Sequence, residues 1–287
     1  MSTYLVTGAT GFIGKALVAR LREGGNSVIA LGGQCGDIAD PTTLAPYQDR
    51  NVDRVFHLAG RTYVPDSWND VTGFHRVNTG GTLNVLEFCR AQKRPLTYIS
   101  AYLYGQQPEQ PISEQATLAP NNPYALTKAL AEQACEFYAR THGLAVTVVR
   151  PFNIYGPGQE ARFLVPSIIA QALAGDEILV MDLAPRRDYL YLDDLTDLLL
   201  ATVQAAPSYR IYNAGTGISL SVAEVIEAVQ AEAGTSKPVR SSQAPRANEI
   251  DDTRADISKA RRELGWAPRH TFRAGIRAIL NTMQAKS

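Results

Sequence analysis

The sequence predicts an α/β protein that combines a doubly wound parallel sheet with a smaller C-terminal α/β lobe. Three observations support this fold class. Short apolar runs alternate with helical patterns, a glycine-rich loop follows the first run, and helical patterns dominate the second half. We expect residues 1–150 to form the sheet domain and residues 151–287 to form mainly the second lobe, with some later segments returning to the sheet.

The candidate strands of the first half are short, rich in Val, Ile, Leu and Tyr, and apolar on both faces. Strands of a parallel sheet that is covered on both sides have this composition. They span residues 3–7, 27–31, 52–58, 96–100 and 145–150. The helical patterns between them cover residues 11–23, 74–92 and 124–142. This alternation implies right-handed crossovers.

The second half is mainly helical, with Pro and Gly at the joins between elements. Helical patterns cover residues 163–174, 192–204, 222–233, 255–264 and 272–284. Short strands are expected at residues 178–180 and 210–212. We interpret this part as a lobe that binds a substrate.

Composition excludes several classes of protein. Lys and Arg number 28 and Asp and Glu number 28, so no long-range field attracts nucleic acid or an anionic membrane. No apolar run approaches the 18 or so residues of a membrane span, and no signal-peptide pattern begins the chain. The cysteines lie in no metal-ligand spacing: Cys35, Cys89 and Cys135. We expect a cytoplasmic protein with no metal site.

A glycine-rich loop connects the first candidate strand to the first candidate helix. In a Rossmann-type sheet, Gly8 would permit the tight turn, Gly11 would let a pyrophosphate approach the backbone, and Gly14 would let the helix pack closely on the strand. The N–H groups at the helix N-terminus would then face the phosphates. This loop predicts binding of a dinucleotide, NAD or NADP, by Gly8, Thr10, Gly11, Phe12, Ile13 and Gly14.

The choice between NAD and NADP stays open. An acidic residue at the end of the second strand would bind the ribose 2′-hydroxyl and repel a 2′-phosphate. The segment from Leu31 to Gln34 contains no acid there, and no Arg or Lys stands close by to favour the phosphate. The sequence therefore permits either cofactor.

A Tyr and a Lys four residues apart are candidates for acid–base chemistry. Tyr124 and Lys128 would lie on one face of a helix, where the ammonium lowers the pKa of the phenol. Ser100 ends a candidate strand, and ligands of open α/β sheets bind beyond such strand ends. Its hydroxyl could hydrogen-bond the oxygen that gains or loses a proton.

The Gly-x-x-Gly-x-x-Gly spacing, joined to Ser100, Tyr124 and Lys128, resembles the extended branch of the short-chain dehydrogenase/reductase superfamily, the NAD-dependent epimerase/dehydratase family. The resemblance covers nearly the whole chain. It implies that further residues contact the cofactor: Asp37, Ile38, Leu58, Ala59, Gly60, Asn78, Pro151 and Asn153, beside Tyr124 and Lys128. It also implies a substrate set, in which the two arginines grip the diphosphate of a nucleotide sugar: Tyr102, Asn153, Arg187 and Arg246.

The resemblance narrows the reaction without settling it. Dehydratases of this family carry an acidic pair or a Ser-Glu pair after the catalytic hydroxyl residue, whereas this chain has Ala101 and Tyr102. Two reactions remain. One resembles GDP-4-keto-6-deoxymannose reductases, which reduce a 4-ketone, and the other resembles UDP-glucose 4-epimerases. We favour the reductase and keep the epimerase and a cofactor-binding regulator without turnover as alternatives.

Two further expectations follow. His57 lies in a strand that is buried by its pattern, so we interpret it as a structural histidine rather than a general base. Family members often dimerise through two helices from each chain. In this sequence those helices would be residues 74–92 and 124–142, which predicts a homodimer.

Overall fold

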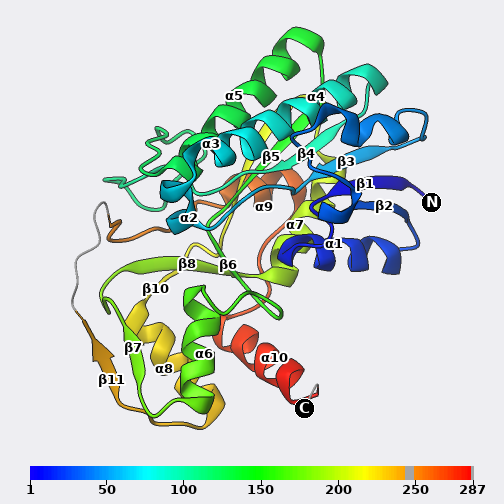
Figure 1. The fold of residues 1–287 in the computed structure, drawn as a ribbon. Helices are drawn as coiled ribbons and strands as arrows, with labels where there is room; N and C mark the ends of the chain where they lie inside the picture. Colours follow the sequence, from blue (N-terminus) through cyan, green and yellow to red (C-terminus); the bar gives the residue numbers. More distant parts are fainter. Residues whose placement is uncertain (243–248, 286–287) are drawn as a thin grey trace.

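The computed structural model describes residues 1–242 and 249–285. At its centre lies a six-stranded sheet, paired in parallel throughout, in the order β2-β1-β3-β4-β5-β9 (Figure 1). The strands are β1 (Thr3–Thr7), β2 (Ser27–Leu31), β3 (Arg54–His57), β4 (Leu96–Ile99), β5 (Val146–Pro151) and β9 (Tyr209–Ala214). The predicted fold class is confirmed, and β9 is a segment of the second half that joins this sheet.

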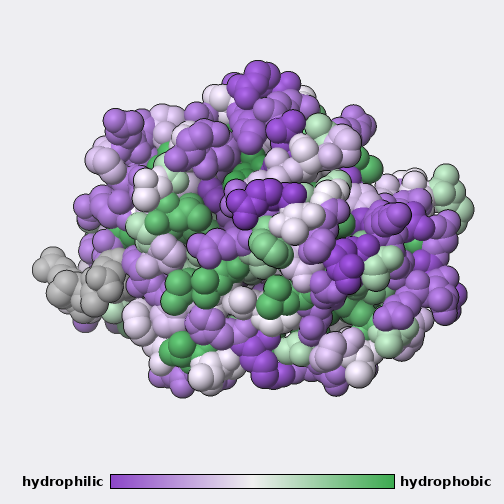
Figure 2. Space-filling model, turned by 90° about the horizontal axis from the view of Figure 1, so that it is seen from above, coloured by the Kyte–Doolittle hydropathy of each residue, from purple (hydrophilic) through white to green (hydrophobic). Residues whose placement is uncertain are grey.

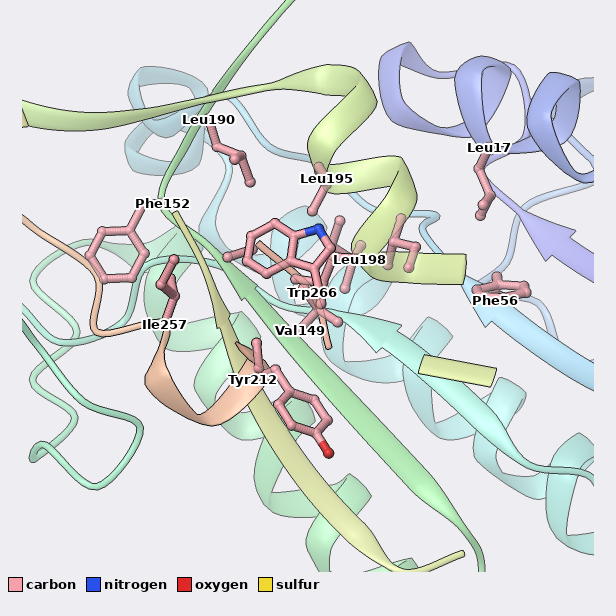
Figure 3. Packing of buried hydrophobic residues seen from close by; sticks show 14 of the residues in the cluster. Leu17, Phe56, Val149, Phe152, Leu190, Leu195, Leu198, Tyr212, Ile257 and Trp266 are labelled. Atoms are coloured by element: carbon pink, nitrogen blue, oxygen red, sulfur yellow. The ribbon is translucent and has the colours of Figure 1, made fainter. Parts of the chain in front are cut away.

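Helices cover both faces of the sheet because successive side chains of each strand point to opposite sides. Leu5 packs into an apolar cluster with α4 (Gly81–Gln92) and α5 (Pro123–His142). Its neighbour Val6 packs on the other face, in the cluster of Figure 3, which also contains Leu17, Leu195 and Trp266. The helices of that second face are α1 (Phe12–Glu23), α7 (Leu192–Ala201) and α9 (Ser258–Leu264).

The helix expected at residues 74–92 is divided. A π-helix (His75–Gly80) stands between α3 (Val71–Phe74) and α4, with the short α2 (Val64–Asn69) before them. Such wide turns often mark functional sites, and here the π-helix carries Asn78. Short 3₁₀ segments cover Gly33–Cys35, Pro41–Tyr47 and Thr202–Gln204.

A second lobe lies below the sheet in Figure 1. It contains a three-stranded sheet, in the order β10-β8-β6, and a parallel pair of β11 and β7. These strands are β6 (Asn153–Tyr155), β7 (Ile178–Val180), β8 (Arg186–Tyr191), β10 (Ser219–Ser221) and β11 (Val239–Ser241). Three helices share its apolar core: α6 (Leu164–Ala174), α8 (Val222–Ala233) and α10 (Phe272–Gln284).

The structure differs from the expected elements mainly in this lobe. The sequence pattern did not predict β6, β8, β10 or β11. β8 begins with charged residues, which is unusual for a strand inside a domain. Its Asp188 is buried, and the carboxylate is satisfied there by the backbone N–H groups of Thr216, Gly217 and Ala255, which donate to it at 2.7, 2.8 and 3.0 Å. The same contact holds Ala255 outside a helix, so α9 begins at Ser258 rather than at residue 255.

Candidate active site

A cleft of about 720 Å³ lies at the carboxyl ends of β1, β3, β4 and β5, and the second lobe closes its other side. Parallel strands place the loops that follow them along the same edge of the sheet, so segments far apart in the sequence meet there. The cleft is lined by the loop after β1, by Leu58 and Gly60 after β3, by Ser100 after β4, and by Arg187 from β8.

The glycine-rich loop can exist only with glycine at two of its positions. Gly8 has a φ of +69°, and a Cβ there would lie 2.6 Å from the backbone nitrogen of Ala59. A Cβ on Gly14 would lie 2.1 Å from the carbonyl oxygen of Gly8. The N–H of Gly11 donates to that same oxygen at 3.0 Å, which closes the turn.

The N-terminus of α1 fits an anionic group. Gly11 is the N-cap, no side chain caps the helix, and its first turn contains no acidic residue. The N–H groups and the positive end of the helix dipole therefore remain available to a phosphate. The loop thus forms a cradle that added side chains would fill, as binding of a pyrophosphate requires.

Most of the predicted cofactor residues border the cleft. Those that line it are Gly8, Gly11, Phe12, Ile13, Gly14, Leu58, Gly60, Tyr124, Lys128, Pro151 and Asn153. The others among the described residues lie beside it or outside it: Thr10, Asp37, Ile38, Ala59 and Asn78. Thr10, in the loop after β1, is exposed and its side chain lies near Gly32, the residue after β2. Ile38 belongs to the buried cluster that includes residues of α4.

Both polar atoms of the Asn78 side chain form hydrogen bonds within the protein. Its Oδ1 accepts from the backbone N–H of Arg61 at 2.8 Å, and its Nδ2 donates to the carbonyl of Arg61 at 3.0 Å and to Thr127 Oγ1 at 2.9 Å. These bonds tie the loop after β3 to α5. Asn78 can therefore shape the cleft without touching a ligand.

Asp37 forms an exposed ion pair with Arg76. The N–H of Ala39, donating at 3.0 Å, and the Arg76 guanidinium hold the pKa of the Asp37 carboxyl below its usual value. Asp37 is therefore an anion whose nearest cation comes from the π-helix.

Ser100, Tyr124 and Lys128 are brought together at the cleft wall. α5 begins just before Tyr124 because Asn122 caps it, accepting from the N–H of Ala125 at 2.9 Å, with Pro123 in its first turn. One turn later, the Lys128 ammonium donates to the carbonyl of Ile99 at 2.6 Å. Ser100 Oγ is buried and has no hydrogen-bond partner within the described chain.

Burial dominates the ionisation of this set. It lowers the pKa of Lys128 to about 7, although the nearby Glu132 carboxylate acts in the opposite direction. The expectation that the Lys128 ammonium lowers the pKa of the Tyr124 phenol is not met in the ligand-free protein, because burial raises that pKa well above the usual value of a phenol. Tyr124 is therefore a neutral hydroxyl in this state, and the unpaired Ser100 hydroxyl is ready for an incoming oxygen.

His57 is wholly buried in β3. Its Nδ1 lies 2.7 Å from Thr7 Oγ1 and its Nε2 lies 3.0 Å from Thr82 Oγ1, so both ring nitrogens have partners. Burial, with the nearby Lys128, lowers its pKa to about 3. The ring is neutral and fixed, in agreement with the structural role expected of it.

Three of the predicted substrate residues line the cleft: Tyr102, Asn153 and Arg187. The Arg187 guanidinium forms an ion pair with Glu249 and donates to the carbonyl of Ile250 at 2.5 Å. Tyr102 lines the cleft, yet its hydroxyl donates to the carbonyl of Gly105 at 2.6 Å. Asn153 Nδ2 donates to the carbonyl of Asp188 at 3.5 Å. Arg246 lies outside the described residues.

The structure adds cleft residues that sequence reasoning missed. Arg162 lies 4.2 Å from the ring centroid of Tyr63 and 3.2 Å from Asp66, which joins the loop before α6 to α2 across the cleft. Tyr189 also lines the cleft, and its hydroxyl is buried without a partner in the described chain. Neither had a local signal, because each depends on how the second lobe sits against the sheet.

Residues 1–242 and 249–285 contain no cluster of three or more His, Cys, Asp or Glu that could hold a metal ion. They also contain no helix long and apolar enough to cross a membrane.

A glycine-rich βα turn on an open parallel sheet, beside a Ser–Tyr–Lys set, defines the extended class of short-chain dehydrogenases/reductases. The chain belongs to the NAD dependent epimerase/dehydratase family, whose family model matches residues 4–215. The family predicted from the motifs is thereby confirmed.

The chain is similar to curated proteins that have two different activities. It is 32% identical to GDP-6-deoxy-D-mannose reductase of Pseudomonas aeruginosa over 98% of this chain and 97% of that one. It is 30% identical to UDP-glucose 4-epimerase of Mycolicibacterium smegmatis over 99% of each. The solved structure of RMD from Pseudomonas aeruginosa complexed with NADPH superposes with a TM-score of 0.91, at 32% identity and 100% coverage of both chains.

Proposed function

We propose that this protein is an NAD(P)-dependent oxidoreductase that reduces the C4 ketone of a nucleoside-diphosphate 4-keto-6-deoxy sugar. One observation carries the proposal: Tyr124 and Lys128 stand one helical turn apart in the same cleft as the unpaired Ser100 hydroxyl and the glycine-rich cradle. The relatedness to a GDP-6-deoxy-D-mannose reductase along nearly the whole chain supports the same reaction.

The chain's own groups would hold the cofactor at one end of the cleft. The backbone of Gly8 and Gly11 and the N-terminus of α1 receive the pyrophosphate, while Leu58, Gly60 and Pro151 border the rest of the dinucleotide. When bound there, the reduced nicotinamide supplies the hydride for the ketone carbon. Either NADH or NADPH fits, because β2 ends without an acid.

Proton transfer would fall to Tyr124. Ser100 Oγ donates a hydrogen bond to the ketone oxygen and aligns it, and Tyr124 gives that oxygen its proton. Lys128, while charged, stabilises the phenolate that remains. In the ligand-free protein the raised pKa of Tyr124 keeps this hydroxyl protonated, which is the form that donates the proton in the reduction.

Substrate binding would use the second lobe. Arg187 and Arg246 grip the diphosphate, and Asn153 and Tyr102 border the sugar. Arg187 is paired with Glu249 in the ligand-free protein, so the diphosphate would replace a carboxylate as the partner of its guanidinium. Exchange of one anion for another leaves the arginine charge compensated throughout.

The epimerase is the second candidate because a UDP-glucose 4-epimerase is related over 99% of the chain. Incubating the purified protein with a panel of nucleotide sugars and NADH or NADPH separates the reactions. Net loss of nicotinamide absorbance with a 4-keto sugar supports the reductase, whereas inversion at C4 without net cofactor change supports the epimerase.

Tyr124→Phe tests whether the protein is an enzyme of this mechanism at all. Loss of its hydroxyl should lower kcat by about a hundredfold or more, while nucleotide-sugar binding is retained. Equal turnover by the wild type and the variant would refute the mechanism. Absence of turnover in both, with NAD(P)H bound, would instead favour a cofactor-binding regulator.

We further propose that the protein is a cytoplasmic homodimer. Its three cysteines are free thiols, as a reducing compartment favours. Figure 2 views the side on which α4 and α5 lie, and hydrophobic residues are grouped near its middle. Leu83 on α4 and Leu126 and Phe137 on α5 are 39%, 43% and 48% exposed, which suits a four-helix interface between two copies.

Sedimentation at micromolar concentration tests the dimer. The wild type should sediment as a dimer and the double variant Leu126→Glu/Phe137→Glu as a monomer, since two carboxylates would be buried in the interface. Leu173→Glu is the matched control, because Leu173 is 45% exposed on α6 in the other lobe. A monomeric wild type would refute the proposal.

A further inference from the structure

The Lys128 ammonium lies between a carbonyl and an aromatic ring. It donates to the carbonyl of Ile99 at 2.6 Å and lies 4.3 Å from the ring centroid of Tyr98. The Tyr98 side chain is wholly buried and does not border the cleft. An ammonium over a ring face at this distance is attracted by the ring's quadrupole, most strongly where water is excluded.

Among the other charged and titratable groups around Lys128, the Glu132 carboxylate favours the ammonium most, but it is shared with a second cation. Glu132, one turn further along α5, is bound by the buried Arg150 guanidinium through hydrogen bonds of 2.6, 3.0 and 3.1 Å. His57 on β3 stays neutral because its pKa is about 3. Burial keeps Cys135 and Tyr124, also on α5, in their neutral forms by raising their pKa values. The ring of Tyr98 is thus a principal partner of this cation.

Tyr98 is also held in place by its neighbours in the strand register. His57 pairs with Tyr98 across β3 and β4, and Thr7 pairs with His57 across β1 and β3. The His57 and Tyr98 rings stack with centroids 5.5 Å apart and planes 26° apart. Thr7 and Thr82 hold both His57 nitrogens, so the stack cannot turn freely. A fixed column therefore runs from β1 to the lysine.

We propose that Tyr98 is a positioning residue that, through the face of its ring, keeps Lys128 charged and in place beside Tyr124. The inference rests on the proposed function for the use made of Lys128. The contact acts through the ring and not through the hydroxyl. Tyr98→Phe should therefore preserve it, and Tyr98→Leu should remove it.

Lysine titration by NMR tests this without any turnover. The full chain contains only six lysines to label with carbon-13: Lys15, Lys93, Lys128, Lys237, Lys259 and Lys286. The Lys128 signal is identified by its loss in Lys128→Arg. It should titrate near pH 7 in the wild type and in Tyr98→Phe, and about one pH unit lower in Tyr98→Leu.

A second series keeps the proposal testable even when the leucine variant does not fold. Phenylalanines with one, two and three ring fluorines at position 98 weaken the ring quadrupole at nearly constant size. The titration midpoint of Lys128 should fall stepwise along the series. The pH at which kcat/KM declines should fall in parallel, whereas a merely structural role would lower activity equally at every pH.

A midpoint that stays constant across the fluorinated series would overturn the inference. Because the titration needs no substrate, it separates the two proposals. If the midpoint follows fluorination while no sugar nucleotide is turned over, the proposed reaction fails and the positioning of Lys128 by Tyr98 stands.

Discussion

Gly14 and Gly8 approach so closely that a Cβ on Gly14 would lie 2.1 Å from the carbonyl oxygen of Gly8. This approach lets the first turn of α1 lie directly behind the loop, with its N–H groups at the cleft. A methyl group at Gly14 must push the helix away from β1. The glycine is therefore required by packing, and the phosphate cradle depends on that packing.

Gly14→Ala should weaken NAD(P)H binding by at least about tenfold, as the displaced helix no longer aims its N–H groups at the pyrophosphate. Fluorescence titration of the bound nicotinamide measures the dissociation constant. Gly80→Ala is the control, since the nearest atom to its added Cβ lies 4.0 Å away. Equal NAD(P)H affinities in the two variants would show that the close packing of Gly14 against Gly8 is not needed for cofactor binding.

Lys128→Met should abolish turnover yet stabilise the fold at low pH. Burial lowers the pKa of Lys128 from 10.5 to about 7, so between these values the unfolded chain binds more protons than the folded one. This side chain therefore destabilises the protein at pH 6 and does so less as pH rises toward 10. Urea unfolding at pH 6 and pH 9.5 should show a gain of a few kcal/mol that shrinks with pH. A gain independent of pH would count against the burial argument.

Glu132→Gln should destabilise the protein by about 3 kcal/mol, because it leaves the Arg150 guanidinium buried without its counter-charge. The two side chains are only 3% and 4% exposed. Glu87→Gln is the matched control: it breaks the Arg90–Glu87 pair, whose side chains are 44% and 50% exposed, and should cost less than about 1 kcal/mol. Chemical denaturation of both variants decides whether burial sets the difference.

Gln34→Asp should weaken NADPH binding at least about tenfold while leaving NADH binding intact or improved, because a carboxylate repels the 2′-phosphate. Thr10 and Gln34 both lie against Gly32 at the end of β2, where this ribose would sit. Asp37→Asn is the comparison, since Asp37 is held by Arg76. In Asp37→Asn the ratio of NADPH to NADH affinity should change less than about twofold. A larger change would show that Asp37, rather than the residue at position 34, determines the choice of cofactor.

Some elements could be predicted because their signals are local. β1, β2 and α8 have the expected bounds, and α1 and α5 differ by a single residue at the start. β6 and β10, three residues each, form only because β8 lies between them as a pairing partner. Neither segment is an apolar run, in contrast to the equally short β7 (Ile178–Val180), whose bounds the sequence predicted.

The sequence by itself determined those features that depend only on residues close together along the chain. It specified the glycine spacing behind β1, the turn that separates Tyr124 from Lys128, and the alternation of strands and helices. The tertiary structure alone decided that Tyr98 meets Lys128 and that Arg187 pairs with Glu249, 62 residues away. These contacts follow from strand register and from the packing of whole elements against one another, and the free energy of that packing is shared among residues far apart in the chain.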